Sequence, residues 1–128
     1  MAGLSEGIQA RLRALADTFS EELPRRMQQI ADSARSALGD ETTIGEVRTL
    51  RHHAHKLAGS AATFGFHHVT ACAKRLEHEL DELLEEDRTP EPEERRRIRM
   101  FVSELSESTR SQASTAGVEE LEQVDDDG

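Results

Sequence analysis

Aromatic residues and cysteine are scarce in this 128-residue sequence, which contains no Trp, no Tyr, four Phe and one Cys. Because the single cysteine, Cys72, has no partner within the chain, it excludes an intramolecular disulfide and is typical of a reducing compartment. No apolar run approaches the length that spans a bilayer, and no basic segment followed by an apolar one marks a signal peptide. We therefore expect a cytoplasmic protein without a membrane partner.

Positive charge is also in short supply. Lys and Arg number 16 against 26 Asp and Glu, which gives a net charge of −10. Nucleic acids and anionic membranes require a basic surface, so we expect neither as a partner. Residues 113–128 hold six acids and no Lys or Arg, which is more than half of the excess. This composition predicts an acidic, disordered tail.

The apolar residues that are present recur at spacings of three and four, which predicts amphipathic helices and no strands. The first such run begins at Ile8, and a second continues from Phe19 to Leu38. Pro24 interrupts the second run, because proline cannot donate a hydrogen bond to the carbonyl four residues before it. We favour two helices here, with a break or kink between Phe19 and Pro24.

Capping and turn residues divide the rest of the chain. Thr43 and Glu46 have the spacing of a capping box at the start of a third helix, although chance accounts for this pair equally well. Gly65 ends that helix, and a fourth apolar stripe follows it. Pro92 suits the first turn of a last helix, which we expect to end near Gln112.

These elements predict an all-α fold, an up-and-down four-helix bundle with an additional N-terminal helix laid against one end. The chain then divides into a flexible N-terminus (residues 1–7), a helical bundle (residues 8–112) and the acidic tail (residues 113–128). A bundle of this length can form a single core. We expect a monomer, because nothing in the pattern requires a second subunit.

The third helix contains the most informative stretch, RHHAHKLAGSAATFG at residues 51–65. His55 projects about 120° from the centre of the apolar stripe, so we expect its imidazole to be exposed. A glycine inside a helix costs about 1 kcal/mol relative to alanine, and Gly59 beside His55 therefore indicates close approach of another macromolecule. The residues that we expect to border His55 and to form a docking surface are Arg51, His52, Lys56, Ala58, Gly59 and Ala62.

This stretch resembles the histidine phosphotransfer (HPt) domain of multistep phosphorelays. The family motif is roughly His-x-Leu-Lys-Gly, followed by small residues and a second glycine, and it reads HKLAGSAATFG from His55 to Gly65. The resemblance extends over about residues 15–112 and puts His55 at the phosphorylated position. The sequence departs from the motif at Ala58, where many members have lysine. Whether Lys56 substitutes for that lysine is left open.

The resemblance implies a phosphoprotein of a two-component regulatory system that carries a phosphoryl group. His55 would accept the group from an aspartyl phosphate on a receiver domain and pass it to another receiver. The implied partners are response-regulator receiver domains and a hybrid histidine kinase. The magnesium ion is expected on the receiver, and no cofactor on this chain. Because the sequence has no Walker loop and no Gly-rich nucleotide loop, we expect no ATP site and no enzyme activity.

Other interpretations were weighed against the phosphocarrier. An HPt-like module could regulate a kinase or response regulator by binding alone, but a histidine at position 55, rather than Asn or Gln, favours phosphorylation. A zinc site needs three or four converging ligands, and His53 lies about 160° from His55 on the helix, so we expect no metal site. For Arg51, His52 and Lys56, a solvated helix face explains the residue as well as a role in balancing phosphate charge.

Overall fold

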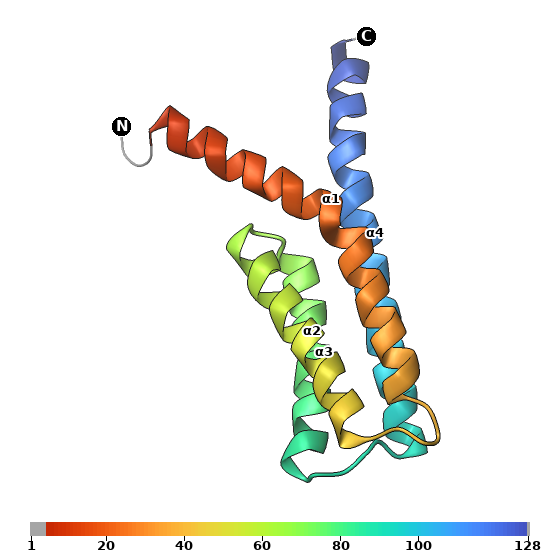
Figure 1. Ribbon diagram of the computed structural model, residues 1–128. Helices are drawn as coiled ribbons and strands as arrows, with labels where there is room; N and C mark the ends of the chain where they lie inside the picture. Colours follow the sequence, from red (N-terminus) through yellow and green to blue (C-terminus); the bar gives the residue numbers. More distant parts are fainter. Residues whose placement is uncertain (1–4, 128) are drawn as a thin grey trace.

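The computed structural model describes the backbone of residues 5–127 and the side chains of residues 5–112. This range forms no strand and four helices: α1 (Glu6–Ala37), α2 (Ile44–Thr63), α3 (His67–Glu85) and α4 (Pro92–Asp127). The helices pack in the pairs α1–α2, α2–α3, α3–α4 and α1–α4, so each contacts two neighbours around a shared core. The chain direction alternates from one helix to the next (Figure 1). The predicted all-α, up-and-down four-helix bundle is therefore confirmed.

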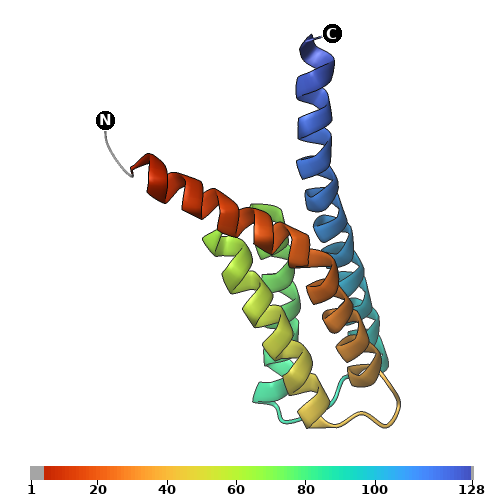
Figure 2. The same cartoon turned by 45° about the horizontal axis from the view of Figure 1, so that its top comes forward.

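The additional N-terminal helix is not confirmed, because α1 is one continuous helix with Pro24 inside it. Its first part points away from the bundle and the remainder runs beside α4, so the helix changes direction along its length (Figures 1 and 2). Pro24 removes only the hydrogen bond to the Ser20 carbonyl, while the flanking turns keep theirs. The loss of one bond bends a helix without ending it.

Both ends of the helical region differ from the prediction. The Ser5 hydroxyl caps α1 by accepting a hydrogen bond from the Ile8 N–H at 3.2 Å. Residues 1–4 of the segment predicted to be flexible lie outside the described residues. The expected end of the last helix near Gln112 is wrong, because α4 continues to Asp127. The sequence beyond Gln112 contains no proline to stop it. Side chains from residue 113 onward are outside the described residues, so the acidic tail as a separate unit stays a prediction.

Short connections hold α2 in register with its neighbours. The capping box is confirmed: the Glu46 N–H donates to Thr43 Oγ1, and the Thr43 N–H donates to the Glu46 carboxylate, each at 3.3 Å. The predicted stop at Gly65 is also confirmed, since α2 ends at Thr63 and Gly65 has φ +78°. Only glycine adopts that conformation without strain. The turn therefore returns the chain antiparallel along α2.

The core consists mainly of aliphatic side chains and alanines from all four helices, together with Phe19, Met27 and Cys72. The predicted stripe of α3 is buried throughout, including Cys72, which is 2% exposed and acts as a small core residue. Burial of each leucine in this core contributes about 1.5–3 kcal/mol, which holds the bundle together. Among the described residues, no helix has both the length and the apolar composition needed to cross a membrane.

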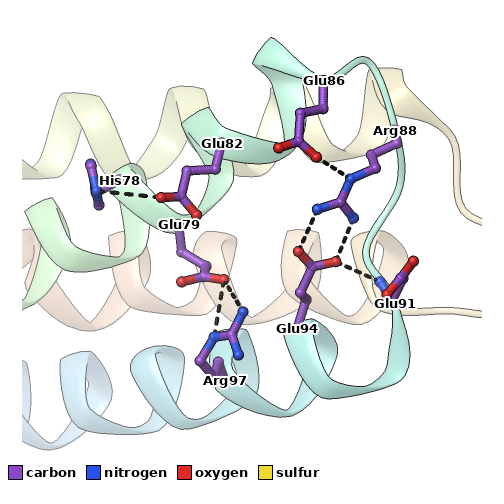
Figure 3. Close-up of polar contacts among 8 residues, drawn as sticks. All are labelled: His78, Glu79, Glu82, Glu86, Arg88, Glu91, Glu94 and Arg97. Carbon is purple, nitrogen blue, oxygen red and sulfur yellow. Dashed lines mark hydrogen bonds and ion pairs between the residues drawn. The ribbon is translucent and has the colours of Figure 1, made fainter.

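A network of ion pairs holds the connection between α3 and α4 (Figure 3). The Arg88 guanidinium donates two hydrogen bonds to the Glu94 carboxylate, at 2.6 and 2.7 Å, and also bonds Glu86. These bonds from Arg88 lower the pKa of Glu94 to about 2. Nearby, Arg97 on α4 donates to Glu79 on α3 at 3.0 Å. The start of α4 is therefore tied to the end of α3 by charge-assisted bonds.

Candidate functional site

His55 lies on the solvent side of α2, as the sequence predicted. The same helix buries Leu50, Ala54 and Leu57 in the core, and none of them is more than 1% exposed. The His55 side chain is 60% exposed. Helical periodicity produces this separation, because residues in steps of three and four share one face. The imidazole is thus carried on a rigid helix and is open to a partner.

A carboxylate on α3 fixes one nitrogen of the His55 ring. Nδ1 of His55 lies 2.7 Å from Oε2 of Glu77. Because a carboxylate only accepts hydrogen bonds, this contact places the ring hydrogen on Nδ1. In the neutral imidazole the other nitrogen, Nε2, then carries the free lone pair. Glu77 is 15% exposed, so its carboxylate has less freedom to move than a surface side chain.

Arg51 supports this carboxylate from α2. Its Nη2 lies 3.3 Å from Oε2 of Glu77, and its Nε donates to Oδ1 of Asp81 at 2.8 Å. Arg51 therefore joins two acids on α3 to the helix that carries His55. Its charge is already shared between these acids, so Arg51 positions Glu77 rather than presenting a free cation to a phosphate.

Four of the other residues predicted to border His55 lie on the surface: His52, Lys56, Gly59 and Ala62 are all exposed. A Cβ atom added at Gly59 would meet nothing within 4 Å. Packing within the protein therefore does not require a glycine at this position. The open space beside His55 is consistent with the expected close approach of a partner, and the docking role itself stays a prediction.

Ala58 is a correction to the predicted docking surface. It is 3% exposed and belongs to the core. Ala58 lies one turn after Ala54, which is fully buried, and α3 packs against α2. The helical repeat gave the direction of Ala58 but not the helix that covers it. The position where many HPt domains have lysine is thus filled here by a small, buried side chain.

Apolar residues of α1 and of the turn after α2 pack beneath the helix that carries His55. Phe19 and Leu23 are buried, and Phe66 is half-buried. The Phe19 ring lies 5.4 Å, between centroids, from the rings of both Phe64 and Phe66. These contacts attach α1 to the turn between α2 and α3, and so support the helix that carries His55.

Sequence reasoning missed Glu77 and Arg26 as residues of the site region. Nothing in the sequence singles out Glu77 among the polar residues of α3, which follow its buried stripe at helical spacing. Arg26 donates from α1 to Ser60 Oγ on α2 at 3.3 Å. Neither contact is visible in one helix, because each joins two helices.

Metal ligands do not converge in the part of the chain that the structure describes. No group of three or more His, Cys, Asp or Glu side chains there has the geometry to hold a metal ion. The arrangement around His55 is an exposed imidazole with a carboxylate on one ring nitrogen. The molecule belongs to the class of antiparallel helical bundles, and it carries this imidazole on its surface.

The comparison with protein families identifies this class. The Hpt domain matches residues 14–108, so the chain belongs to the Hpt domain family, as the motif predicted. Hpt domains are phosphocarriers rather than catalysts, with a general role in histidine phosphotransfer within phosphorelays, and they interact with receiver domains and kinases. Comparisons with curated proteins and with solved structures found no match.

Proposed function

We propose that His55 is the phosphorylated residue of this Hpt domain. It accepts a phosphoryl group from the aspartyl phosphate of one receiver domain and passes it to another receiver. The observation that carries this proposal is the contact of 2.7 Å between His55 Nδ1 and Glu77, on a side chain that is otherwise 60% exposed. It leaves Nε2 as the nitrogen with a free lone pair and an open approach.

In this proposal the transfer uses two groups of this chain, the His55 imidazole and the Glu77 carboxylate. The lone pair of His55 Nε2 attacks phosphorus in line with the bond to the aspartate oxygen. A nitrogen–phosphorus bond forms, the phosphorus–oxygen bond breaks, and its electrons remain on the aspartate, which becomes a carboxylate again. The positive charge that develops on the imidazole is balanced at Nδ1 by the Glu77 carboxylate. The same steps in reverse deliver the group to a second receiver.

The partner supplies the rest of the chemistry. Phosphoryl transfer depends mainly on positioning and on neutralising charge on the phosphoryl oxygens. In this proposal the receiver provides the aspartate and the magnesium ion, and a hybrid histidine kinase stands upstream. The chain needs no cofactor and no ATP site of its own. It acts as a monomer, because His55, Glu77 and Arg51 come from one chain.

A phosphotransfer assay tests the proposal. A receiver domain carrying a labelled aspartyl phosphate is incubated with the protein and magnesium, alongside the variants His55→Gln and His52→Gln. We expect an acid-labile, base-stable label on the wild type and on His52→Gln, and no label on His55→Gln. His52→Gln is the matched control, because it removes an exposed imidazole from the same helix.

Two results would contradict the proposal. Label that persists on His55→Gln would assign phosphorylation to another residue. No label from any receiver of the source organism, with the helical fold verified by circular dichroism, would favour the alternative of a non-phosphorylated HPt-like module that regulates a kinase or response regulator by binding.

A further inference from the structure

The part of α2 that carries His55 is basic, although the protein as a whole is acidic. The net charge of the chain is −10, yet residues 47–63 of α2 contain no Asp or Glu. The basic and imidazole side chains on this part of α2 are Arg48, Arg51, His52, His53, His55 and Lys56. Carboxylates of the bundle neutralise Arg51, through Glu77 and Asp81. In the described part of the chain, Lys56 has no ion pair.

A hollow between α1 and α2 extends this basic surface. Its volume is about 190 Å³, and it is lined by Arg25, Arg26, Gln29, His53, Lys56 and Leu57. Two guanidinium groups, an ammonium group and an amide are therefore gathered at one small depression. His53, Lys56 and Leu57 line the hollow from the helix that carries His55, so a protein that covers both the hollow and His55 would contact α1 and α2 together.

One wall of the hollow is held in place before any ligand arrives. The Arg26 guanidinium donates to Ser60 Oγ at 3.3 Å and lies 5.2 Å from the centroid of the Phe19 ring. The nearest acid, Glu22, lies 3.7 Å from Arg25 and 3.9 Å from Arg26. Such long, exposed pairs contribute little, and two cations share this one carboxylate. Positive charge is therefore left over in the hollow.

His53 responds to the same surroundings. Burial lowers the pKa of His53, and the neighbouring charges of His52 and Lys56 lower it further. Positively charged neighbours lower the pKa of a histidine because they repel the added proton, so their part of this shift indicates a positive local potential. An anion seated in the hollow would relieve that potential and would meet donors from two helices.

We propose that this hollow receives a carboxylate side chain of the receiver domain that docks on His55. The inference rests on the proposed function, because only that function brings a receiver to this face. Guanidinium groups bind carboxylates with paired, charge-assisted hydrogen bonds. The basic groups spread from His55 over α2 to Arg25 on α1, an area that suits a protein surface better than a free ion. Complementary charge at such a rim steers association and selects partners.

Charge reversal in the hollow tests the inference. The variant combines Arg25→Glu with Gln29→Glu, and the control combines Arg99→Glu with Gln9→Glu, which makes the same change in net charge at exposed positions away from the hollow. Two rates are measured for each protein. The first is phosphorylation of His55 by phosphoramidate, a small donor without a docking surface. The second is transfer from a receiver domain phosphorylated with acetyl phosphate in the presence of magnesium.

We expect the ratio of receiver transfer to small-donor phosphorylation to fall about tenfold in the hollow variant, mainly through a higher KM for the receiver, and to change less than about twofold in the control. The salt dependence of receiver transfer should also weaken. Circular dichroism verifies that both variants remain folded.

Three results would overturn the inference. The first is an unchanged ratio in the hollow variant, and the second is an equal loss in the control. The third is saturable binding of inorganic phosphate to the hollow residues, followed by NMR at constant ionic strength, while the same phosphate leaves receiver transfer unaffected. That result would assign the hollow to a free anion. Failure of the proposed function gives a different result from these three, because the wild type would then form no phosphohistidine with either donor. The docking inference would then be wrong as well.

Discussion

At the scale of single residues, the site depends on a carboxylate that orients an imidazole. Glu77 bonds His55 Nδ1 at 2.7 Å, while Arg51 contacts the same carboxylate oxygen from 3.3 Å. A hydrogen bond to one ring nitrogen selects the tautomer and leaves the other nitrogen to react. In the proposed function Glu77 is a positioning residue, because it would act on the transfer only through the His55 ring.

Replacing Glu77 by alanine should therefore change the tautomer of His55. We expect nitrogen NMR to show a mixture of the two neutral tautomers in Glu77→Ala, where the wild type shows hydrogen on Nδ1. Phosphoryl transfer from a receiver should slow by about tenfold, because less of His55 then has its free lone pair on Nε2 and the charge that develops on the imidazole loses its carboxylate. Glu77→Gln is the conservative control, because its amide oxygen can still accept from Nδ1. An unaltered tautomer in Glu77→Ala would show that the contact has no orienting role.

Gly59 allows a second test at this scale. Because a Cβ at Gly59 would meet nothing within 4 Å, Gly59→Leu should leave the bundle folded, with a free energy of unfolding equal to or up to about 1 kcal/mol above that of the wild type. The bulky side chain should nevertheless block transfer from a receiver, while phosphoramidate still phosphorylates His55.

Gly59→Ala is the matched control for this substitution, because it removes the helical cost of glycine with the smallest side chain. Its receiver transfer should lie between that of the wild type and that of Gly59→Leu. Transfer at the normal rate in Gly59→Leu would contradict the argument that a partner approaches this position closely.

At the scale of elements, α1 combines two parts with different surroundings. Leu23 is fully buried in the bundle, whereas Leu12, three turns earlier in α1, is 45% exposed. Ile8 and Leu15 on the same part are about half exposed as well. The helix is continuous, but only its later part has helices on which to pack.

This difference predicts unequal costs for the same substitution in one helix. Leu23→Ala should lower the free energy of unfolding by about 2–5 kcal/mol, because it leaves a cavity in the core. Leu12→Ala should change it by less than about 1 kcal/mol, because the side chain loses little buried surface and alanine is a good helix former. Urea unfolding followed by circular dichroism gives both values. Similar losses in the two variants would mean that the early part of α1 packs on the bundle.

At the scale of the whole molecule, acid should unfold the protein partly through the connection between α3 and α4. The bonds from Arg88 hold the pKa of Glu94 at about 2, well below its ordinary value of 4.5 (Figure 3). Since the folded protein lowers this pKa, the stabilising effect is complete above pH 4.5. It is lost as the pH falls toward 2, when Glu94 takes up a proton on unfolding.

The variant Glu94→Gln should remove this part of the pH dependence. As the pH falls from 4.5 to 2, the free energy of unfolding should decrease less steeply in Glu94→Gln than in the wild type. The difference between the two slopes should correspond to the uptake of up to one proton on unfolding. Glu93→Gln is the control, because Glu93 is exposed on the same turn and makes no ion pair within the described residues. Identical slopes in the wild type and Glu94→Gln would contradict the role of this pair.

The sequence by itself determined the helices, most of the core and the exposed position of His55. Helical spacing of apolar residues, the Thr43 capping box and Gly65 are local signals, and they act within one or two turns of the chain. They located the bounds of α2 and the buried stripe of α3. The motif around His55 identified the Hpt family before any contact was known, because its residues are consecutive.

Only the tertiary structure decided how these helices face one another. It continued α1 through Pro24 and buried Ala58. It also brought Glu77 to the His55 ring and placed Arg25 and Lys56 at one hollow. Each of these depends on the rotation and spacing of two helices. Periodicity along one helix gives the direction of a side chain but not its neighbour, because the neighbour is set by packing of the whole core. The orienting carboxylate and the basic hollow are products of that packing.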